Sequence, residues 1–152
     1  MLLRPARGSD RADVEGLLRH AGLPLDGVAE HLGTFIVAED RAAIVGVAGL
    51  EIHGRDALLR SVVVVPEARG RGLGAALTQR ALAEARSSSL GTVYLLTSTA
   101  EAFFPRFGFE RITWDRVPVK VQESREFHGA CPSSAVAMRA VLDGVVRQGS
   151  AK

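Results

Sequence analysis

The sequence predicts one α/β (α+β) domain with a central mixed, mostly antiparallel sheet of six to seven strands, flanked by about four helices. Three observations predict it. Helical periodicity near the start is followed by consecutive β-prone runs, and residues 57–97 then read as a strand, a helix and a strand. A chain of 152 residues fits one domain. We expect that domain over residues 1–142 and a loose tail over residues 143–152.

The chain opens with a short apolar strand over residues 1–6. A helix follows, with Ser9 as its N-cap and Gly22 and Pro24 as its end signals. Its apolar face has the i, i+3, i+4, i+7 spacing of Val14, Leu17, Leu18 and Ala21. Residues 25–32 read as a second short helix.

Three strands come next, over residues 34–39, 43–52 and 57–65. They are rich in Val, Ile and Phe, and residues 53–56 form a turn that makes a hairpin of the last two. Pro66 ends the third strand because it cannot donate to a β-ladder.

The second half begins with a helix whose apolar residues lie four apart, at Leu73, Leu77, Ala81 and Ala85. Residues 118–127 have a mixed pattern and receive no element. The remaining elements are, in order, a helix over 72–86, a strand over 92–97, a short helix over 99–106, a strand near 109–113 and a last strand over 134–142.

Composition and charge exclude several classes of protein. The net charge is +2, and the basic residues are scattered, with no block typical of nucleic-acid or membrane-surface binding. No apolar run approaches the ~20 residues of a membrane helix, and the N-terminus shows no signal-peptide pattern. Cys131 is the single cysteine, which excludes an internal disulfide. We expect a cytoplasmic protein that binds neither nucleic acid nor membrane.

The most specific stretch is a Val-rich strand followed by the glycines Gly70, Gly72 and Gly74 at the start of a helix. Glycines let a backbone approach a ligand closely, and the first N–H groups of a helix form a site for anions. A P-loop is excluded because it would need a Gly-Lys-Ser/Thr sequence. A Rossmann fingerprint does not fit either, since Glu84 falls inside the helix. A flexible strand-to-helix connection is the alternative.

Two motifs resemble those of the GNAT superfamily of acetyl-CoA-dependent N-acetyltransferases. Arg69-x-x-Gly72-x-Gly74 is similar to its Arg/Gln-x-x-Gly-x-Gly/Ala signature, and the stretch from Phe103 to Phe109 is similar to its aromatic-x-x-x-Gly-Phe element. The element order over residues 1–142 agrees with the GNAT fold. The resemblance implies acetyl-CoA as co-substrate and direct acetyl transfer without a metal.

The resemblance also implies which residues hold the cofactor. The backbone of Val62, Val63 and Val64 would pair with the pantetheine arm as an added strand. Thr97 and Phe104 would also contact the cofactor. The pyrophosphate would lie on the segment Arg69, Gly70, Arg71, Gly72, Leu73, Gly74 and Ala75.

Acetyl transfer needs a neutral amine, donors for the oxyanion, and a route for the thiolate to leave. The N–H of Val63, or alternatively that of Val64, is the expected oxyanion donor. Many GNAT enzymes have a tyrosine as general acid where this chain has Phe104, and Tyr94 does not match that position. The thiolate therefore leaves without a tyrosine, or water or a hydroxyl such as that of Thr97 or Ser98 assists.

Glu51, near the end of the strand over residues 43–52, is the expected general base. Its alternative is a solvated acid at a strand end. His53 is a second candidate base, in the turn that follows.

Further resemblances concern the acceptor amine. Residues 95–100 are similar to a segment of amino-acid N-acetyltransferases, including the N-acetylglutamate synthase type. Residues 58–64, 116–118 and 126–135 are similar to the ArsN-type arsenic-resistance N-acetyltransferases. They imply acetylation of the α-amine of a small glutamate-like amino acid or antimetabolite, such as arsinothricin or phosphinothricin.

Such a substrate carries anionic groups, which arginine binds in a bidentate manner. Arg60 is the expected clamp, because it interrupts an otherwise apolar strand; an outward-facing surface arginine is the alternative. The other expected substrate contacts are Ser61, Thr97, Ser98 and Arg111.

Two other functions are compatible with the same sequence features. One is a GNAT enzyme for a polyamine, an aminoglycoside or a protein N-terminus. The other is a non-catalytic module that binds acyl-CoA, which the loss of the tyrosine at Phe104 favours. Residues 117–135 and the last strand are a candidate interface for a homodimer.

Overall fold

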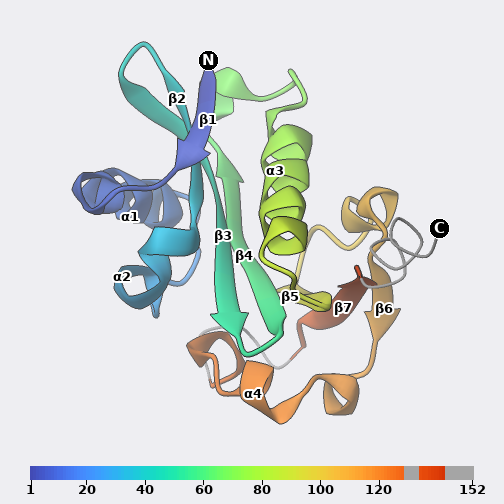
Figure 1. Ribbon diagram of the computed structural model, residues 1–152. Coiled ribbons are helices and arrows are strands. Elements are labelled where there is room, and N and C mark those ends of the chain that lie inside the picture. Colours follow the sequence, from blue (N-terminus) through green and yellow to red (C-terminus); the bar gives the residue numbers. More distant parts are fainter. Residues whose placement is uncertain (129–133, 143–152) are drawn as a thin grey trace, which may run out of the picture. The chain divides into compact units, whose positions relative to one another are not determined.

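The computed structural model describes residues 1–128 and 134–142, which fall into two compact units. The first unit contains Met1–Glu51 and Leu59–Ala81, and the second contains Ile52–Leu58 and the chain from Leu82 onward. Cys131 and the expected tail over residues 143–152 lie outside the described residues. Seven strands and four α-helices are present in the described part, as the sequence predicts (Figure 1).

The first unit is built on four strands in the order β1-β2-β3-β4 (Figure 1). Strand β1 (Leu2–Pro5) pairs antiparallel with β2 (Ile36–Asp40), and β2 pairs antiparallel with β3 (Ala43–His53). Strand β4 (Asp56–Val64) follows β3, and these two strands contribute residues to both units.

Helices α1 (Arg11–His20) and α2 (Val28–His31) lie between β1 and β2 in the chain, and α3 (Leu73–Ser87) follows β4. The core of the unit joins Val14 and Leu18 of α1 to side chains of the strands and of the segment around α2. Its buried members are Ala6, Val14, Leu18, Val28, Leu32, Phe35, Val37, Val47 and Val63.

Phe35 is fully buried and depends on a glycine of β3. A Cβ atom added at Gly49 would lie 2.5–2.8 Å from three atoms of the Phe35 ring, which is closer than real contacts allow. Gly49 therefore makes room for the aromatic ring that fills the centre of this unit.

An ion-pair cluster links β1 to the 3₁₀ turn that precedes α1 and to β2. The guanidinium of Arg4 donates to Asp10 Oδ2 at 2.8 Å and Oδ1 at 3.0 Å, and its Nε donates to Glu39 Oε1 at 2.8 Å. Asp10 also accepts the backbone N–H of Arg7 at 2.7 Å. The hydrogen bonds from Arg4 and Arg7 hold the pKa of Asp10 below its usual value.

The second unit has the strand order β5-β7-β6. Strand β7 (Val136–Val141) pairs antiparallel with both β5 (Thr92–Thr97) and β6 (Glu110–Ile112). Helix α4 (Val119–Gln122) follows β6 in the chain. The core residues of this unit are Leu58, Tyr94, Ile112, Val117, Val121 and Ala137.

The strands agree with the sequence prediction within about two residues, whereas the short helices differ. The helix expected over 99–106 is only a 3₁₀ turn at Phe104–Phe107, and that expected over 25–32 is reduced to α2 and a 3₁₀ turn at Leu32–Thr34. Ser9 does not cap α1, because it lies inside a 3₁₀ turn that precedes the helix. Within the part of the chain that the structure describes, no helix has the length and apolar character to cross a membrane.

Replacing Gly49 by Ala should destabilise the fold by about 1–3 kcal/mol, because the new methyl group would overpack the buried Phe35 ring. Urea unfolding measures the loss. Gly16→Ala in α1 is the matched control: an added Cβ meets no atom within 4 Å there, so we expect a gain of about 0.4–1 kcal/mol. Equal effects of the two substitutions would contradict the packing argument.

Asp10→Asn should lower the free energy of unfolding at pH 7. The folded-state pKa of Asp10 is lowered, so its contribution is present above the unfolded-state value of about 3.9 and is lost as pH falls through the folded-state value. The difference in free energy of unfolding between wild type and Asp10→Asn should therefore become smaller from pH 5 to pH 2. Denaturant unfolding at each pH measures this difference. Asp13→Asn, at an exposed position of α1, is the control.

Candidate functional site

Glu51 and Arg60 form a buried ion pair between β3 and β4. Arg60 Nη1 lies 2.8 Å from Glu51 Oε2, and the two side chains are 0% and 1% exposed. Removal of two charges from water is costly unless their remaining donors and acceptors are also satisfied. The surroundings of this pair supply such partners.

The guanidinium of Arg60 also binds the connection between α1 and α2. Nη2 donates to the carbonyl of Pro24 at 3.0 Å, and Nη1 donates to the carbonyl of Asp26. Nε donates to Ser61 Oγ at 2.9 Å. The sequence predicts this guanidinium as a clamp for a substrate anion; the structure instead commits it to protein oxygens.

Gly27 allows the backbone to approach this ion pair closely. It has a left-handed φ of +82°, and an added Cβ would lie 3.0 Å from Arg60 Nη1 and 3.4 Å from Glu51 Oε2. A larger residue would push the loop away from both charged groups. The sequence gives no signal for this glycine, because the contact is formed by strands 24 and 33 residues further along the chain.

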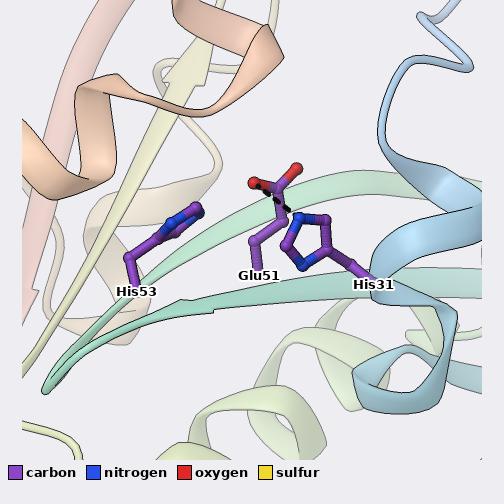
Figure 2. Close-up of side chains that lie close together, drawn as sticks. All are labelled: His31, Glu51 and His53. Carbon is purple, nitrogen blue, oxygen red and sulfur yellow. Dashed lines mark ion pairs between the residues drawn. The ribbon is translucent and has the colours of Figure 1, made fainter.

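His31, the last residue of α2, faces the same carboxylate (Figure 2). Its Nε2 lies 3.7 Å from Glu51 Oε1, and its side chain is 28% exposed while that of Glu51 is 1% exposed. The imidazole is therefore the solvent-accessible neighbour of a buried charge. Sequence reasoning missed His31, because a lone histidine at the end of a short helix carries no pattern.

Figure 2 also labels His53, the second candidate base. It is the last residue of β3 rather than part of the turn, two positions after Glu51. Side chains two apart on a strand project to the same face.

Ser61 follows Arg60 and interrupts the regular conformation of β4. Its φ of +59° is rare for a residue with a side chain. Val62 and Val64 after it are partly buried, and Val63 joins the core of the first unit. The polar cluster thus ends directly at the strand segment for which the sequence predicts cofactor contacts.

The glycine-rich turn has the backbone that an anion site requires. Gly70 and Gly72 have φ values of +83° and +75°, and an added Cβ on either would meet no protein atom within 4 Å. The carbonyl of Gly72 accepts the N–H of Ala76 at 3.0 Å, which starts α3. The N–H groups of Leu73, Gly74 and Ala75 therefore belong to the first turn, where a helix supplies no partners of its own.

Arg69 is fixed beside this turn. It is exposed, and its Nε donates to the carbonyl of Val64 at 2.9 Å. This bond folds the side chain back over the end of β4. Arg71 is also exposed.

Four further predicted residues belong to the second unit. Phe104 is buried and meets Phe103 and Phe109 edge to face, with centroids 5.0 and 5.8 Å away. Thr97 Oγ1 accepts the N–H of Ala100 at 3.0 Å, and Ser98 is exposed.

Arg111, the fourth of them, is two-thirds exposed and pairs with Glu101 at 3.3 Å. Tyr94, which has no predicted role, lies in the core of this unit, and burial raises its pKa.

Comparison with known proteins gives three relevant similarities. The uncharacterized N-acetyltransferase CT2212 of Chlorobaculum tepidum is 28% identical over 98 residues, 64% of this chain and 63% of that protein. The chain therefore spans less than two thirds of that relative. Rv2747 of Mycobacterium tuberculosis, solved in complex with CoA and NLQ, has a TM-score of 0.77 and 26% identity, over 93% of this chain and 99% of that chain.

The third similarity is to N-acetylglutamate synthase of Neisseria gonorrhoeae, complexed with coenzyme A and N-acetyl-glutamate. Its TM-score is 0.80 at 19% identity, over 93% of this chain and 35% of that chain, which shows a shared fold. The family model of the Acetyltransferase (GNAT) domain matches residues 31–111, just over half of the sequence. That span includes His31, Glu51, the Val-rich strand and the glycine-rich turn, so this chain belongs to the GNAT acetyltransferase family.

Proposed function

We propose that this chain transfers the acetyl group of acetyl-CoA to the α-amine of a small glutamate-like amino acid or antimetabolite, of the arsinothricin or phosphinothricin type. The observation that carries the acetyl-CoA part is the turn before α3. Two left-handed glycines, Gly70 and Gly72, precede a 15-residue helix, and the exposed Arg69 and Arg71 flank Gly70 in the sequence. A helix N-terminus with adjacent arginines suits a pyrophosphate.

The proposal also includes the cofactor contacts that the resemblance to GNAT enzymes implies. The backbone of Val62, Val63 and Val64 pairs with the pantetheine arm, and the N–H of Val63 stabilises the oxyanion. Thr97 and Phe104 complete the cofactor contacts. Phe104 cannot donate a proton, so the thiolate leaves without a tyrosine acid, or water or a hydroxyl such as that of Thr97 or Ser98 assists.

The acceptor is the less constrained part of the proposal. The N-acetylglutamate synthase of Neisseria gonorrhoeae, solved with coenzyme A and N-acetyl-glutamate, supports a small amino-acid-like acceptor, and Rv2747, solved with CoA, supports the cofactor. Ser61, Thr97, Ser98 and Arg111 are the proposed acceptor contacts. Arg111 replaces Arg60 as the cation for the acceptor's anion, because it is two-thirds exposed whereas Arg60 is buried.

A non-catalytic acyl-CoA-binding module is the second candidate, and the buried Phe104 favours it. The two functions separate in a free-thiol release assay with acetyl-CoA and glutamate, phosphinothricin or arsinothricin as acceptor. The enzyme releases thiol with at least one of these and not with spermidine. The module binds CoA and releases none.

Replacing Gly72 by Ala should weaken CoA binding about tenfold. A side chain at φ +75° costs about 1–2 kcal/mol, so the turn relaxes and its N–H groups leave the phosphates. Calorimetry with CoA measures the change. Gly22→Ala is the matched control, since Gly22 has a φ of +72° and open space around it at the end of α1. Equal CoA affinities of Gly72→Ala and Gly22→Ala would contradict the role of the glycine-rich turn in phosphate binding.

Replacing Arg60 by Ala should lower the free energy of unfolding by about 3–5 kcal/mol, because Glu51 would remain buried without its partner. Arg11→Ala is the control: Arg11 is 56% exposed and pairs with Glu15 on the surface, so we expect a loss of about 1 kcal/mol or less. If Arg60→Ala instead unfolded like wild type and only raised the acceptor KM, the guanidinium would bind substrate, as the sequence predicts.

A further inference from the structure

Glu51 is the expected base, yet its burial sets a problem for that role. With 1% of its side chain exposed, the carboxylate cannot meet an amine that arrives from solvent. Arg60 Nη1 lies 2.8 Å from Glu51 Oε2, so the carboxylate already has a buried cationic partner. A buried carboxylate held in this way is suited to orient and stabilise a neighbouring group that does exchange protons.

We propose that His31 is the catalytic base that takes the proton from the acceptor amine, and that Glu51 and Arg60 position it. This inference rests on the proposed acetyl transfer. His31 adjoins Glu51 across 3.7 Å and has 28% of its side chain exposed (Figure 2). The pair therefore connects a fixed buried charge to an accessible imidazole, the side chain that ordinarily changes charge between pH 5 and 8.

The carboxylate gives the imidazole a partner for the charge that it gains. His31 Nε2 lies 3.7 Å from Glu51 Oε1, and Arg60 Nη1 lies 2.8 Å from Glu51 Oε2. The positive charge that forms on the ring when it takes the proton is stabilised by the adjacent carboxylate.

The place of the cluster along the chain fits this role. Arg60 is followed at once by Ser61 and by Val62–Val64, the strand segment proposed to hold the acyl arm. Gly27 and the carbonyl groups of Pro24 and Asp26 keep the α1–α2 connection close to the ion pair. The ion pair that positions His31 therefore directly precedes, along the chain, the segment proposed to present the thioester.

The step balances as follows. The ammonium form of the acceptor loses one proton to the imidazole of His31, and the neutral amine attacks the acetyl carbon. The new C–N bond replaces the C–S bond, and coenzyme A leaves as thiolate. The nitrogen then loses its second proton; one of the two protons ends on the thiolate and the other in solvent.

The charged and titratable groups around His31 decide how the pH dependence of kcat/KM is interpreted. Glu51 of β3 and Arg60 of β4 face it, and Glu30 precedes it on α2. His53, two positions after Glu51, is the other imidazole (Figure 2). Imidazole is the side chain that ordinarily changes charge in the range from pH 6 to 8, so the comparison of His31 and His53 variants assigns an acidic limb there.

The experiment measures kcat/KM for the accepted glutamate-like amine from pH 5.5 to 9.5 in wild type, His31→Gln and His20→Gln. We expect His31→Gln to lose about 10²-fold or more at pH 7 and to lose the acidic limb of the profile. Added imidazole should restore part of the rate, which it would not do for a structural defect. His20 is an exposed histidine of α1, so His20→Gln should behave as wild type. CoA affinity by calorimetry should be equal in all three proteins.

Several outcomes would overturn the assignment. His31→Gln with the wild-type rate and profile would leave acetyl transfer intact and reject His31 as base. An acidic limb that persists in His31→Gln but disappears in His53→Gln would move the base to His53. A wild-type protein that binds CoA and acetylates none of the amines would reject the proposed function, and the base with it.

Discussion

The buried pair between Arg60 and Glu51 organises the first unit. Its charges can stay out of water only because backbone carbonyls and a serine hydroxyl take up the remaining donors of the guanidinium. Those carbonyls belong to the α1–α2 connection, so the position of that connection, of Gly27 and of His31 depends on the pair. Phe35, with the guanidinium 6.0 Å from its ring centroid, joins the pair to the hydrophobic core.

The strand and helix pattern could be predicted because it depends on local sequence. The hairpin of β3 and β4, the stop at Pro66 and the helix after the glycine-rich turn all arise from neighbouring residues. The same holds for the left-handed conformations of Gly70 and Gly72. Short helices were predicted less well, because tertiary contacts rather than periodicity decide where a single turn ends.

The polar cluster illustrates what local patterns cannot supply. The sequence pointed to Glu51 and Arg60 separately, since Glu51 lies near the end of one strand and Arg60 interrupts another that is otherwise apolar. It did not show that they bind each other, because the register of neighbouring strands decides which side chains meet. The role expected of Arg60 changed for that reason, and His31 was missed because its partner is twenty residues away.

The second unit has a different kind of long-range dependence. Strands β5 and β6 are consecutive in the chain, yet each is hydrogen-bonded to β7, which enters between them. While the protein emerges from the ribosome, both strands expose unpaired edges until Val136–Val141 has been synthesised. The nascent chain can therefore associate through these strand edges until this late stage. A stop codon or a protease cut upstream of β7 would leave β5 and β6 without their shared partner and prone to pair with other chains.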